Sequence, residues 1–314
     1  MPPLEPSLQH FGNPFARYFA ATRPAFLSVT LAGALIGLGT ASADGLHIDV
    51  LKAFLTILFV LVAHAGANVV NDYYDALNGS DAANQDRLFP FTGGSRFIQN
   101  GVLSLRETKV FGYALLAVVI PPGLWLATHS ATGLIPIGML GLLIAWAYSA
   151  PPLKLMSRGM GEVGITGGWL LVVLGTDFVQ RSAFSPLPLW AGLPFALLVA
   201  AILYINQFPD RPADELAGKR TLVVRLGPAR ASWGYVLLTV TAYLSLLLAI
   251  VFNKLPVCAA AGLPPAFLSF KACRQLLVDA GYPSRLAPAI KQTVAAANVN
   301  GLLLAASLAI CHII

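Results

Sequence analysis

The chain has 314 residues, of which 57% are apolar or aromatic (AVILMFWYC) and 11% are charged. Soluble domains carry about 25% charged residues. The composition therefore excludes a soluble domain, and the mean hydropathy of +0.72 indicates an integral membrane protein. The net charge of +6 does not indicate nucleic-acid binding, because Lys and Arg in a membrane protein mainly set its orientation. Apolar runs of about 20 residues recur along the chain, so we expect residues 1–314 to form one all-α integral-membrane domain.

Nine apolar segments are predicted to be transmembrane helices. They lie near residues 24–42, 50–71, 108–128, 131–149, 161–180, 188–208, 229–252, 255–271 and 288–312. Two acidic motifs follow the second and the sixth of these segments, four helices apart. This spacing predicts two similar helical halves around a cavity that faces the cytoplasm.

The positive charges predict the orientation in the membrane. The N-terminal tail and the regions after segments 2, 4, 6 and 8 carry every Lys and Arg except Lys52, Arg181 and Lys254. Cytoplasmic loops are enriched in Lys and Arg. We therefore expect the N-terminus and the two long polar loops, near 72–107 and 209–228, to be cytoplasmic. The C-terminus would lie on or near the outer face of an inner (cytoplasmic) membrane.

Some residues that often carry chemistry give no functional prediction. Cys258, Cys273 and Cys311 lack the spacing of a metal motif, and we expect them to be small apolar residues within helices. His64, inside the second segment, is expected to form an interhelical hydrogen bond rather than to act as a base. Asp177 is expected at the outer end of the fifth segment, far from the acidic motifs.

Two clusters of Asn and Asp residues stand at the ends of apolar segments. They consist of Asn68, Asn71, Asp72 and Asp75 in the first cluster, and of Asn206, Asp210 and Asp214 in the second. Residues three or four apart share a helix face, so each cluster presents a stripe of oxygen atoms. Carboxylates are costly near hydrocarbon, whereas Mg²⁺ takes oxygen ligands, including substrate phosphates. Two facing stripes therefore predict a membrane-embedded site for Mg²⁺ and a diphosphate.

These residues carry a resemblance to a known family. The chain resembles the UbiA superfamily of intramembrane prenyltransferases over essentially its full length. The family pattern N-D-x-x-D matches Asn71, Asp72 and Asp75, and its D-x-x-x-D pattern matches Asp210 and Asp214. Further matches are Arg23-Pro24 and the block that contains Tyr148, Lys154, Arg158 and Glu162.

Residues 71–87 and 206–227 look most like 1,4-dihydroxy-2-naphthoate prenyltransferases of menaquinone synthesis. Many superfamily members carry a third acid where this chain has Gly79, and Asp81 is the nearest substitute. The Y-x-x-x-K element of the family is stretched here, with Tyr148 and Lys154 six residues apart. The resemblance implies an enzyme that transfers a prenyl group from an isoprenyl diphosphate to an aromatic acceptor, with Mg²⁺ as cofactor and the lipid bilayer as surroundings.

The resemblance also implies roles for individual residues. The expected metal ligands are Asn71, Asp72, Asp75, Asp81, Asp210 and Asp214. The expected diphosphate-binding residues are Arg87, Arg96, Lys154 and Lys219. The expected substrate-binding residues are Arg23, Asn68, Tyr148 and Asn206. Among these, Asp72, Asp75, Asp210, Asp214 and Lys154 are expected to be catalytic, because bound Mg²⁺ and nearby cations neutralise the charge that develops on a leaving diphosphate.

Alternatives remain open at this point. The acceptor is expected to be 1,4-dihydroxy-2-naphthoate, which would lose its carboxyl group as CO₂, but 4-hydroxybenzoate or another aromatic compound is an alternative. A membrane transporter is an alternative of a different class, because polar residues in membrane helices also mark transport sites. A transporter site is expected near the midplane of the membrane, whereas these acids stand at one end of their helices.

Overall fold

The computed structural model describes residues 5–311, and all the regular secondary structure in this range is helical. The α-helices are α1 (Pro14–Ala21), α2 (Leu27–Ala43), α3 (Val50–Asn78), α4 (Ser80–Ala83), α5 (Leu105–Val118), α6 (Ile120–His129), α7 (Leu134–Ala147), α8 (Gly161–Arg181), α9 (Leu187–Leu216), α10 (Leu222–Leu226), α11 (Pro228–Val251), α12 (Ala266–Asp279) and α13 (Ala287–Ile310). The 3₁₀-helices are η1 (Pro24–Phe26), η2 (Met156–Arg158), η3 (Val257–Gly262) and η4 (Pro283–Arg285).

Several helical stretches in the described range are long and apolar enough to cross a membrane. They are Pro24–Ala43, Val50–Asn78, Leu105–His129, Gly161–Arg181, Leu187–Leu216, Pro228–Val251 and Ala287–Ile310, seven in all. The apolar helix α7 is shorter, with 14 residues. The expectation of an all-helical polytopic membrane protein is therefore confirmed, whereas the expected number of nine spans is not.

Prolines account for the main differences from the predicted segments. The predicted segment 255–271 is divided into η3 and α12, which are separated by Pro264 and Pro265, and α12 continues to Asp279. The predicted segment 108–128 consists of α5 and α6, which break at Val119 just before Pro121 and Pro122. A proline has no N–H to donate and its ring clashes with the preceding turn, so it kinks a helix or ends it; here it ends both helices.

The helices that carry the two acidic motifs extend further than predicted. α3 continues to Asn78, where Gly79 ends it with a left-handed φ of +82°, a common helix stop. α9 continues to Leu216 and contains Pro209 and Pro212 in its last turns. The Asn and Asp clusters therefore lie within helical turns, and not at the start of the loops expected at 72–107 and 209–228. Helical geometry holds their side chains at fixed intervals.

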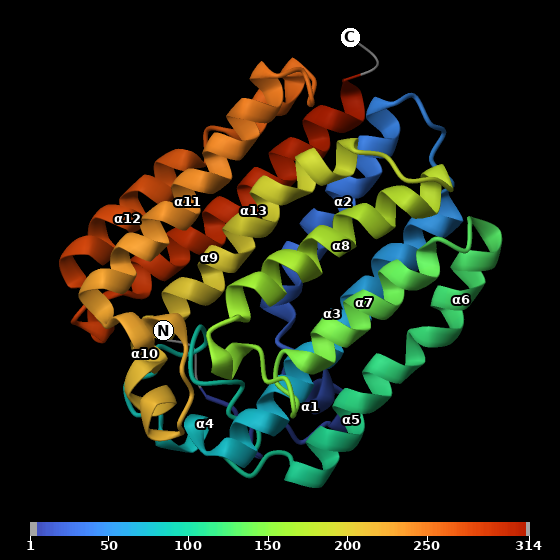
Figure 1. Ribbon diagram of the computed structural model, residues 1–314. Helices are drawn as coiled ribbons and strands as arrows, with labels where there is room; N and C mark the ends of the chain where they lie inside the picture. The colour runs from blue at the N-terminus through green and yellow to red at the C-terminus, as the bar shows by residue number, and fades with distance from the viewer. Residues whose placement is uncertain (1–4, 312–314) are drawn as a thin grey trace.

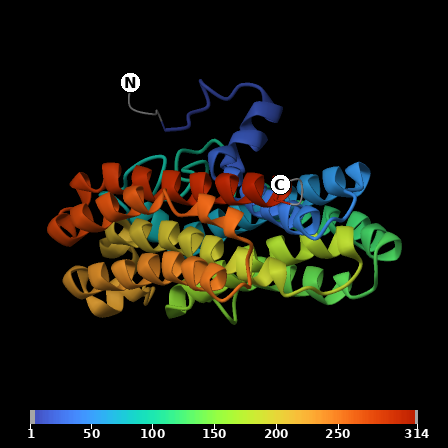
Figure 2. The ribbon, with the colours of Figure 1, turned by 90° about the horizontal axis from the view of Figure 1, so that it is seen from above.

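The long helices lie side by side and run between two ends of the molecule (Figures 1 and 2). α13 packs along α2, α8 along α9, and α3 along α5. The largest buried cluster includes Ile36, Phe195, Leu246, Leu304 and Leu308 from four of these helices. Small residues allow the close approach, which is typical of membrane helices. At Gly37 of α2, for example, an added Cβ would lie 2.5 Å from the carbonyl oxygen of Val173 in α8.

One end of the bundle, which we call the acidic end, carries Asp75, Asp81, Asp210 and Asp214. In Figure 1 it is the lower end, where α4 and α10 lie. The N-terminal segment with α1 projects from one side of the bundle in Figure 2. Its Ala21 packs with Phe97, Val102 and Leu103 of the loop that follows α4, so the N-terminal segment covers part of this loop.

The opposite end is held together by a buried ion pair. Asp177 of α8 is 1% exposed and accepts hydrogen bonds from Arg181 Nε at 2.7 Å and from Thr40 Oγ1 of α2 at 2.9 Å. Arg181 also contacts Asp44 at 2.6 Å. Asp177 thus lies away from the acidic end, as expected, and it links α2 to α8.

A disulfide joins Cys258 of η3 to Cys311 after α13, whereas both were expected to be unpaired apolar residues. The two cysteines are separated by 53 residues in sequence, and the packing of η3 against α13 brings their Cα atoms to 6.2 Å. Cys273 is free. Pairing over this separation could not be inferred from cysteine spacing, because it depends on which helices become neighbours.

Candidate active site

A cavity of about 480 Å³ opens between α3, α7, α8 and α9 and extends from the acidic end toward the opposite end. At the acidic end its wall contains carboxylate, amide and ammonium groups. Further along, its wall consists mainly of apolar side chains. These include Phe59, Val60, Leu134, Ile137, Leu142 and Val172. The combination of a charged end and a long apolar part suits a ligand with a charged head group and a hydrocarbon chain.

The last turns of α3 contribute one polar stripe to the cavity. Asn68, Asn71 and Asp75 line it. Asn71 Nδ2 donates to Asp75 Oδ2 at 3.0 Å, and Asn78 Nδ2 donates to Asp75 Oδ1 at 3.1 Å. Asn71 also donates to Ser149 Oγ at 3.1 Å. These bonds fix the Asp75 carboxylate at the rim of the cavity and tie α3 to the segment after α7.

Asp72 does not share the lining of the cavity with the other members of its cluster. It is 4% exposed, forms an ion pair with Arg23, and accepts a hydrogen bond from the backbone N–H of Ser95 at 3.3 Å. Arg23 itself lines the cavity and has a left-handed φ of +56°, which is uncommon for a residue other than glycine. In this geometry Asp72 orients Arg23 and the loop that contains Ser95.

The last turns of α9 contribute the second polar stripe. Asn206, Asp210 and Asp214 all line the cavity. Asn84, which follows α4, donates to Asp210 Oδ1 at 2.5 Å, and the Asn206 Oδ1 atom is buried without a hydrogen-bond partner among residues 5–311. The second cluster therefore forms the stripe that the sequence predicts.

Lys219 joins the two stripes. Its side chain is 5% exposed, and Nζ lies 2.7 Å from Asp75 Oδ1 and 3.3 Å from Asp214 Oδ1. The backbone N–H of Lys219 donates to the carbonyl oxygen of Asp214 at 2.8 Å, which turns the chain back toward the cavity after α9. Burial by itself would lower the pKa of Lys219, but the neighbouring Asp75 and Asp214 carboxylates raise the pKa above its ordinary value. The ammonium group therefore stays charged.

Asp81 of α4 brings a further carboxylate to the cavity. It is 5% exposed, and burial together with the nearby Asp75 raises its pKa to about 6. Gly94 lies against it with a left-handed φ of +74°, and an added Cβ would overlap the Asp81 carboxyl group. Arg96 is buried and donates to the backbone carbonyl of Asp81. The Gly-Gly-Ser-Arg stretch thus packs directly against the site.

Other residues expected at the site are placed differently. Tyr148 lines the cavity, but Arg87 and Lys154 do not. Arg87 Nε instead donates to Glu5 Oε1 at 2.6 Å, and this hydrogen bond lowers the pKa of Glu5 below its ordinary value, although burial acts in the opposite direction. Lys154 is exposed in the loop after α7, with a φ of +44°. The structure does not bring these two cations to the acids.

Several polar side chains that the sequence did not indicate also line the acidic end, and three of them stand out. They are Ser80, Asn84 and Thr221. Ser80 Oγ and Thr221 Oγ1 are buried and have no hydrogen-bond partner in the described part of the chain. Asn84 lies three residues after Asp81, so a continuation of the first motif through the short helix α4 could have indicated it. Thr221 follows Lys219 by two residues, in a segment that only the tertiary structure places at the cavity.

The donor set fits a hard divalent cation together with a phosphorylated ligand. No group of three His, Cys, Asp or Glu side chains within residues 5–311 is close enough to hold one ion by itself. The acids are instead separated by Lys219 and supplemented by amide and hydroxyl oxygens that lack partners. Mg²⁺ typically takes one or two carboxylates and completes its coordination with waters and substrate phosphates, which is the donor set that this site offers.

The fold and the site together define a polytopic helical membrane protein with an acid-lined cavity for an amphiphilic ligand. Comparison with known families gives the same class. The model of the UbiA prenyltransferase family matches residues 28–291. The chain belongs to the UbiA prenyltransferase family, and it is an enzyme of the prenyl-transferring class rather than a transporter.

Individual relatives cover nearly the whole chain. A 1,4-dihydroxy-2-naphthoate octaprenyltransferase of Mycobacterium tuberculosis is 31% identical over 302 residues, which cover 94% of this chain and 97% of that protein. An enzyme of the same name from Escherichia coli is 28% identical over 294 residues, covering 91% of this chain and 92% of that protein.

Solved structures share the fold. A UbiA homologue from Aeropyrum pernix superposes with a TM-score of 0.66 at 18% identity, covering 89% of this chain and 96% of that one. A UbiA homologue from Archaeoglobus fulgidus, solved with DMAPP and Mg²⁺ bound, superposes with a TM-score of 0.64 at 19% identity, covering 89% of this chain and 98% of that one.

Proposed function

We propose that the enzyme transfers a prenyl group from an isoprenyl diphosphate to 1,4-dihydroxy-2-naphthoate, with loss of CO₂, in menaquinone biosynthesis. The observation that carries the proposal is the cavity itself. Asp75, Asp81, Asp210 and Asp214 lie at one end, and the remainder of the wall is mainly apolar. The naphthoate acceptor is favoured over 4-hydroxybenzoate because relatives named for the naphthoate substrate match nearly the full length of the chain.

The diphosphate binds at the acidic end. Lys219 and Arg23 face the cavity there and supply positive charge, while the carboxylates supply oxygen ligands. Mg²⁺, when bound with the diphosphate, acts as a Lewis acid that neutralises negative charge on the leaving group. Lys219 is held between Asp75 and Asp214, so its charge is fixed in place before substrate arrives, and no reorganisation is needed during the reaction.

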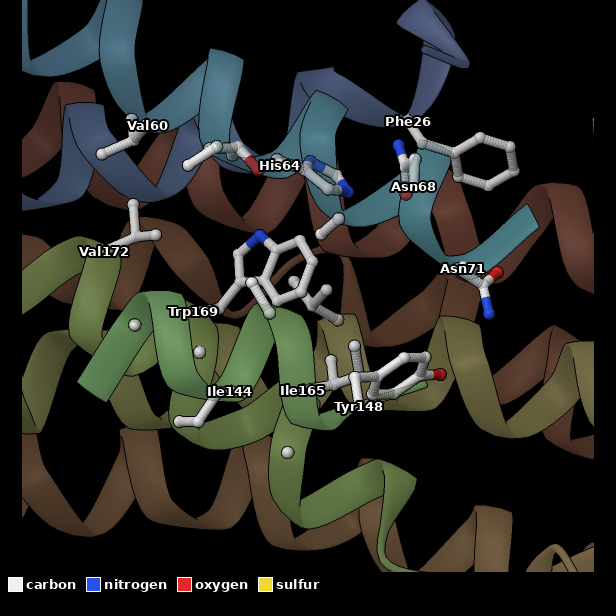
Figure 3. A pocket seen from close by; sticks show the side chains of 18 of the residues that line it. Phe26, Val60, His64, Asn68, Asn71, Ile144, Tyr148, Ile165, Trp169 and Val172 are labelled. Atoms are coloured by element: carbon white, nitrogen blue, oxygen red, sulfur yellow. Dashed lines mark hydrogen bonds between the residues drawn. The ribbon is translucent and has the colours of Figure 1, made fainter. Parts of the chain in front are cut away.

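The prenyl chain occupies the apolar part of the cavity. The carbon–oxygen bond to diphosphate breaks, and its electron pair leaves with the diphosphate. The ring carbon that bears the carboxylate supplies the pair for the new carbon–carbon bond. CO₂ then departs, and the pair from its bond restores the aromatic ring. Tyr148 lines the cavity beside Asn71 (Figure 3), where its ring can stabilise allylic positive charge by cation–π attraction.

The same proposal places the acidic end at the cytoplasmic face of the inner membrane. All Lys and Arg residues except Lys52, Arg181 and Lys254 belong to the regions expected on that side, and positive residues are enriched in cytoplasmic loops. Water-soluble acceptor would then reach the site from the cytoplasm, while the isoprenyl diphosphate arrives from the bilayer.

Product analysis tests the proposed reaction. Purified enzyme is incubated with Mg²⁺, an isoprenyl diphosphate, and either 1,4-dihydroxy-2-naphthoate or 4-hydroxybenzoate, and the lipid products are analysed by mass spectrometry. The expected product is a prenylated naphthoquinol that lacks the carboxylate. A faster reaction with 4-hydroxybenzoate, giving a product that retains the carboxylate, would replace the proposed acceptor while leaving the diphosphate site unchanged.

A further inference from the structure

His64 and Trp169 face each other in the middle of the cavity, away from the acids. His64 belongs to α3 and Trp169 to α8, and their ring centroids are 4.9 Å apart with the planes at 85°. In Figure 3 the pair lies between Val60 and Val172 on one side and Asn71 and Tyr148 on the other. Polar ring atoms therefore occur within a part of the cavity whose other side chains are largely apolar.

Thr30 of α2 holds the His64 ring by a hydrogen bond at Nδ1. Thr30 Oγ1 lies 2.7 Å from His64 Nδ1, which confirms the interhelical hydrogen bond expected from the sequence. Which atom donates depends on the tautomer of His64, and the Thr30 hydroxyl donates when Nδ1 carries no proton. A neutral imidazole with an accepting Nδ1 carries its proton on Nε2. In that tautomer His64 presents an N–H donor on its other ring nitrogen.

Asn68 supplies a hydrogen-bond acceptor beside this donor. It lies one helical turn from His64, on the face of α3 that lines the cavity (Figure 3). Asn68 Nδ2 donates to the carbonyl oxygen of Thr22 at 3.0 Å, which fixes the amide so that Oδ1 is left to accept. The Asn68 side chain also lies within hydrogen-bonding reach of the His64 ring, so the two groups are close enough for one hydroxyl to contact both. A neighbouring donor and acceptor match a hydroxyl group, which accepts one hydrogen bond and donates another.

We propose that His64 and Asn68 bind a ring hydroxyl of the aromatic acceptor, and that Trp169 forms the wall against which the ring packs. The assignment rests on the proposed function. His64 precedes Asn71 by seven residues, which is about 10 Å along the helix axis. The site therefore selects a hydroxylated aromatic compound and holds its reacting ring toward the diphosphate.

Binding measurements separate this role from effects on reactivity. The dissociation constants of 1,4-dihydroxy-2-naphthoate and of 1-hydroxy-2-naphthoate, which lacks one hydroxyl, are measured by calorimetry with an unreactive prenyl thiodiphosphate present. Wild-type enzyme should bind the monohydroxy compound about tenfold more weakly, because buried polar groups are left without partners. His64→Phe keeps a planar ring and loses the donor, so it should bind the two compounds with similar affinity.

Val60→Ala is the matched control. Val60 lies one turn from His64 on the same face of α3 and has no polar side-chain atom, so the tenfold ratio of the two dissociation constants should persist.

Thr30→Val provides a second test if His64→Phe does not fold. It should lower the ratio of the two dissociation constants, because Nδ1 is no longer held as an acceptor. An unchanged ratio in both variants, or equal affinities in the wild type, would overturn the assignment. Absence of prenyl transfer to any aromatic acceptor would instead overturn the proposed function.

Discussion

Lys219 Nζ lies 2.7 Å from Asp75 Oδ1, so one buried ammonium group connects the end of α3 to the segment that follows α9. The same ammonium contacts Asp214 of α9 at 3.3 Å. Because the two motif helices are far apart in sequence, this contact sets the spacing of the carboxylates on the two sides of the cavity. Both the stability and the activity of the enzyme are expected to depend on it.

Lys219→Met should leave Asp75 and Asp214 buried without their cation. Removal of one partner from a buried pair costs about 3–5 kcal/mol, and loss of a preorganised charge lowers turnover by about 10²–10³-fold. Thermal unfolding in detergent and steady-state prenyl transfer measure the two effects. The neighbouring Arg220 is exposed, and Arg220→Met is the matched control, expected to retain activity within about threefold. Equal effects of both variants would contradict the assigned role of Lys219.

Gly94→Ala should displace Asp81. The added Cβ would overlap the Asp81 carboxyl group, and the φ of +74° is unfavourable for alanine. Gly101 has a similar φ of +69°, but an added Cβ there would contact nothing within 4 Å. Gly101→Ala therefore reports the backbone cost alone, about 1–2 kcal/mol. We expect Gly94→Ala to lose transfer activity and Gly101→Ala to retain it. Similar activities in the two variants would show that the contact with Asp81 is unimportant.

Removal of divalent cations should abolish prenyl transfer, and addition of Mg²⁺ should restore it, because the oxygen donor set suits a hard cation. Asp214→Asn should raise the Mg²⁺ concentration required for half-maximal activity. Glu215, the next residue of α9, has a 59% exposed side chain paired with Arg211, and Glu215→Gln is the control that should leave this concentration unchanged. Full activity in the presence of EDTA would contradict a metal-dependent reaction.

Reduction of the Cys258–Cys311 disulfide should destabilise the enzyme. Opening a covalent loop that spans 53 residues is expected to cost about 2–4 kcal/mol through the entropy of the unfolded chain. Thermal unfolding with and without reductant measures the loss, and Cys311→Ser should show a lowered Tm that reductant no longer changes. Cys273 is free, so the response of Cys273→Ser to reductant should equal that of the wild type. An unchanged wild-type Tm after complete reduction would show that the disulfide does not contribute to stability.

Labelling of introduced cysteines should establish the orientation. Gln85 lies in an exposed loop at the acidic end, and Ala183 is exposed at the opposite end. In a Cys273→Ser background, a membrane-impermeant thiol reagent should label Ala183→Cys in intact cells. It should label Gln85→Cys only after permeabilisation, because the loop that contains Gln85 is expected in the cytoplasm. The reverse labelling pattern would invert the proposed topology.

Composition and residue spacing are enough to predict the helical membrane class and most of the acidic end. Long apolar runs require helices because the backbone must satisfy its own hydrogen bonds in lipid. Helical periodicity places Asn206, Asp210 and Asp214 on one face, and the structure shows all three lining the cavity. These features depend on local geometry, which residue spacing specifies directly.

Which side chains contact one another depends on the tertiary structure. Asp72 satisfies the same periodicity as Asp75 but pairs with Arg23, and Lys219 reaches the acids whereas Lys154 remains exposed. Asn84 contacts Asp210 across 126 residues of sequence, and Cys258 pairs with Cys311. Prolines account for differences between the predicted and the observed number of spans, and between their predicted and observed ends. Contacts between distant segments depend on how whole helices pack and on where loops return, and residue spacing within one helix carries no information about either.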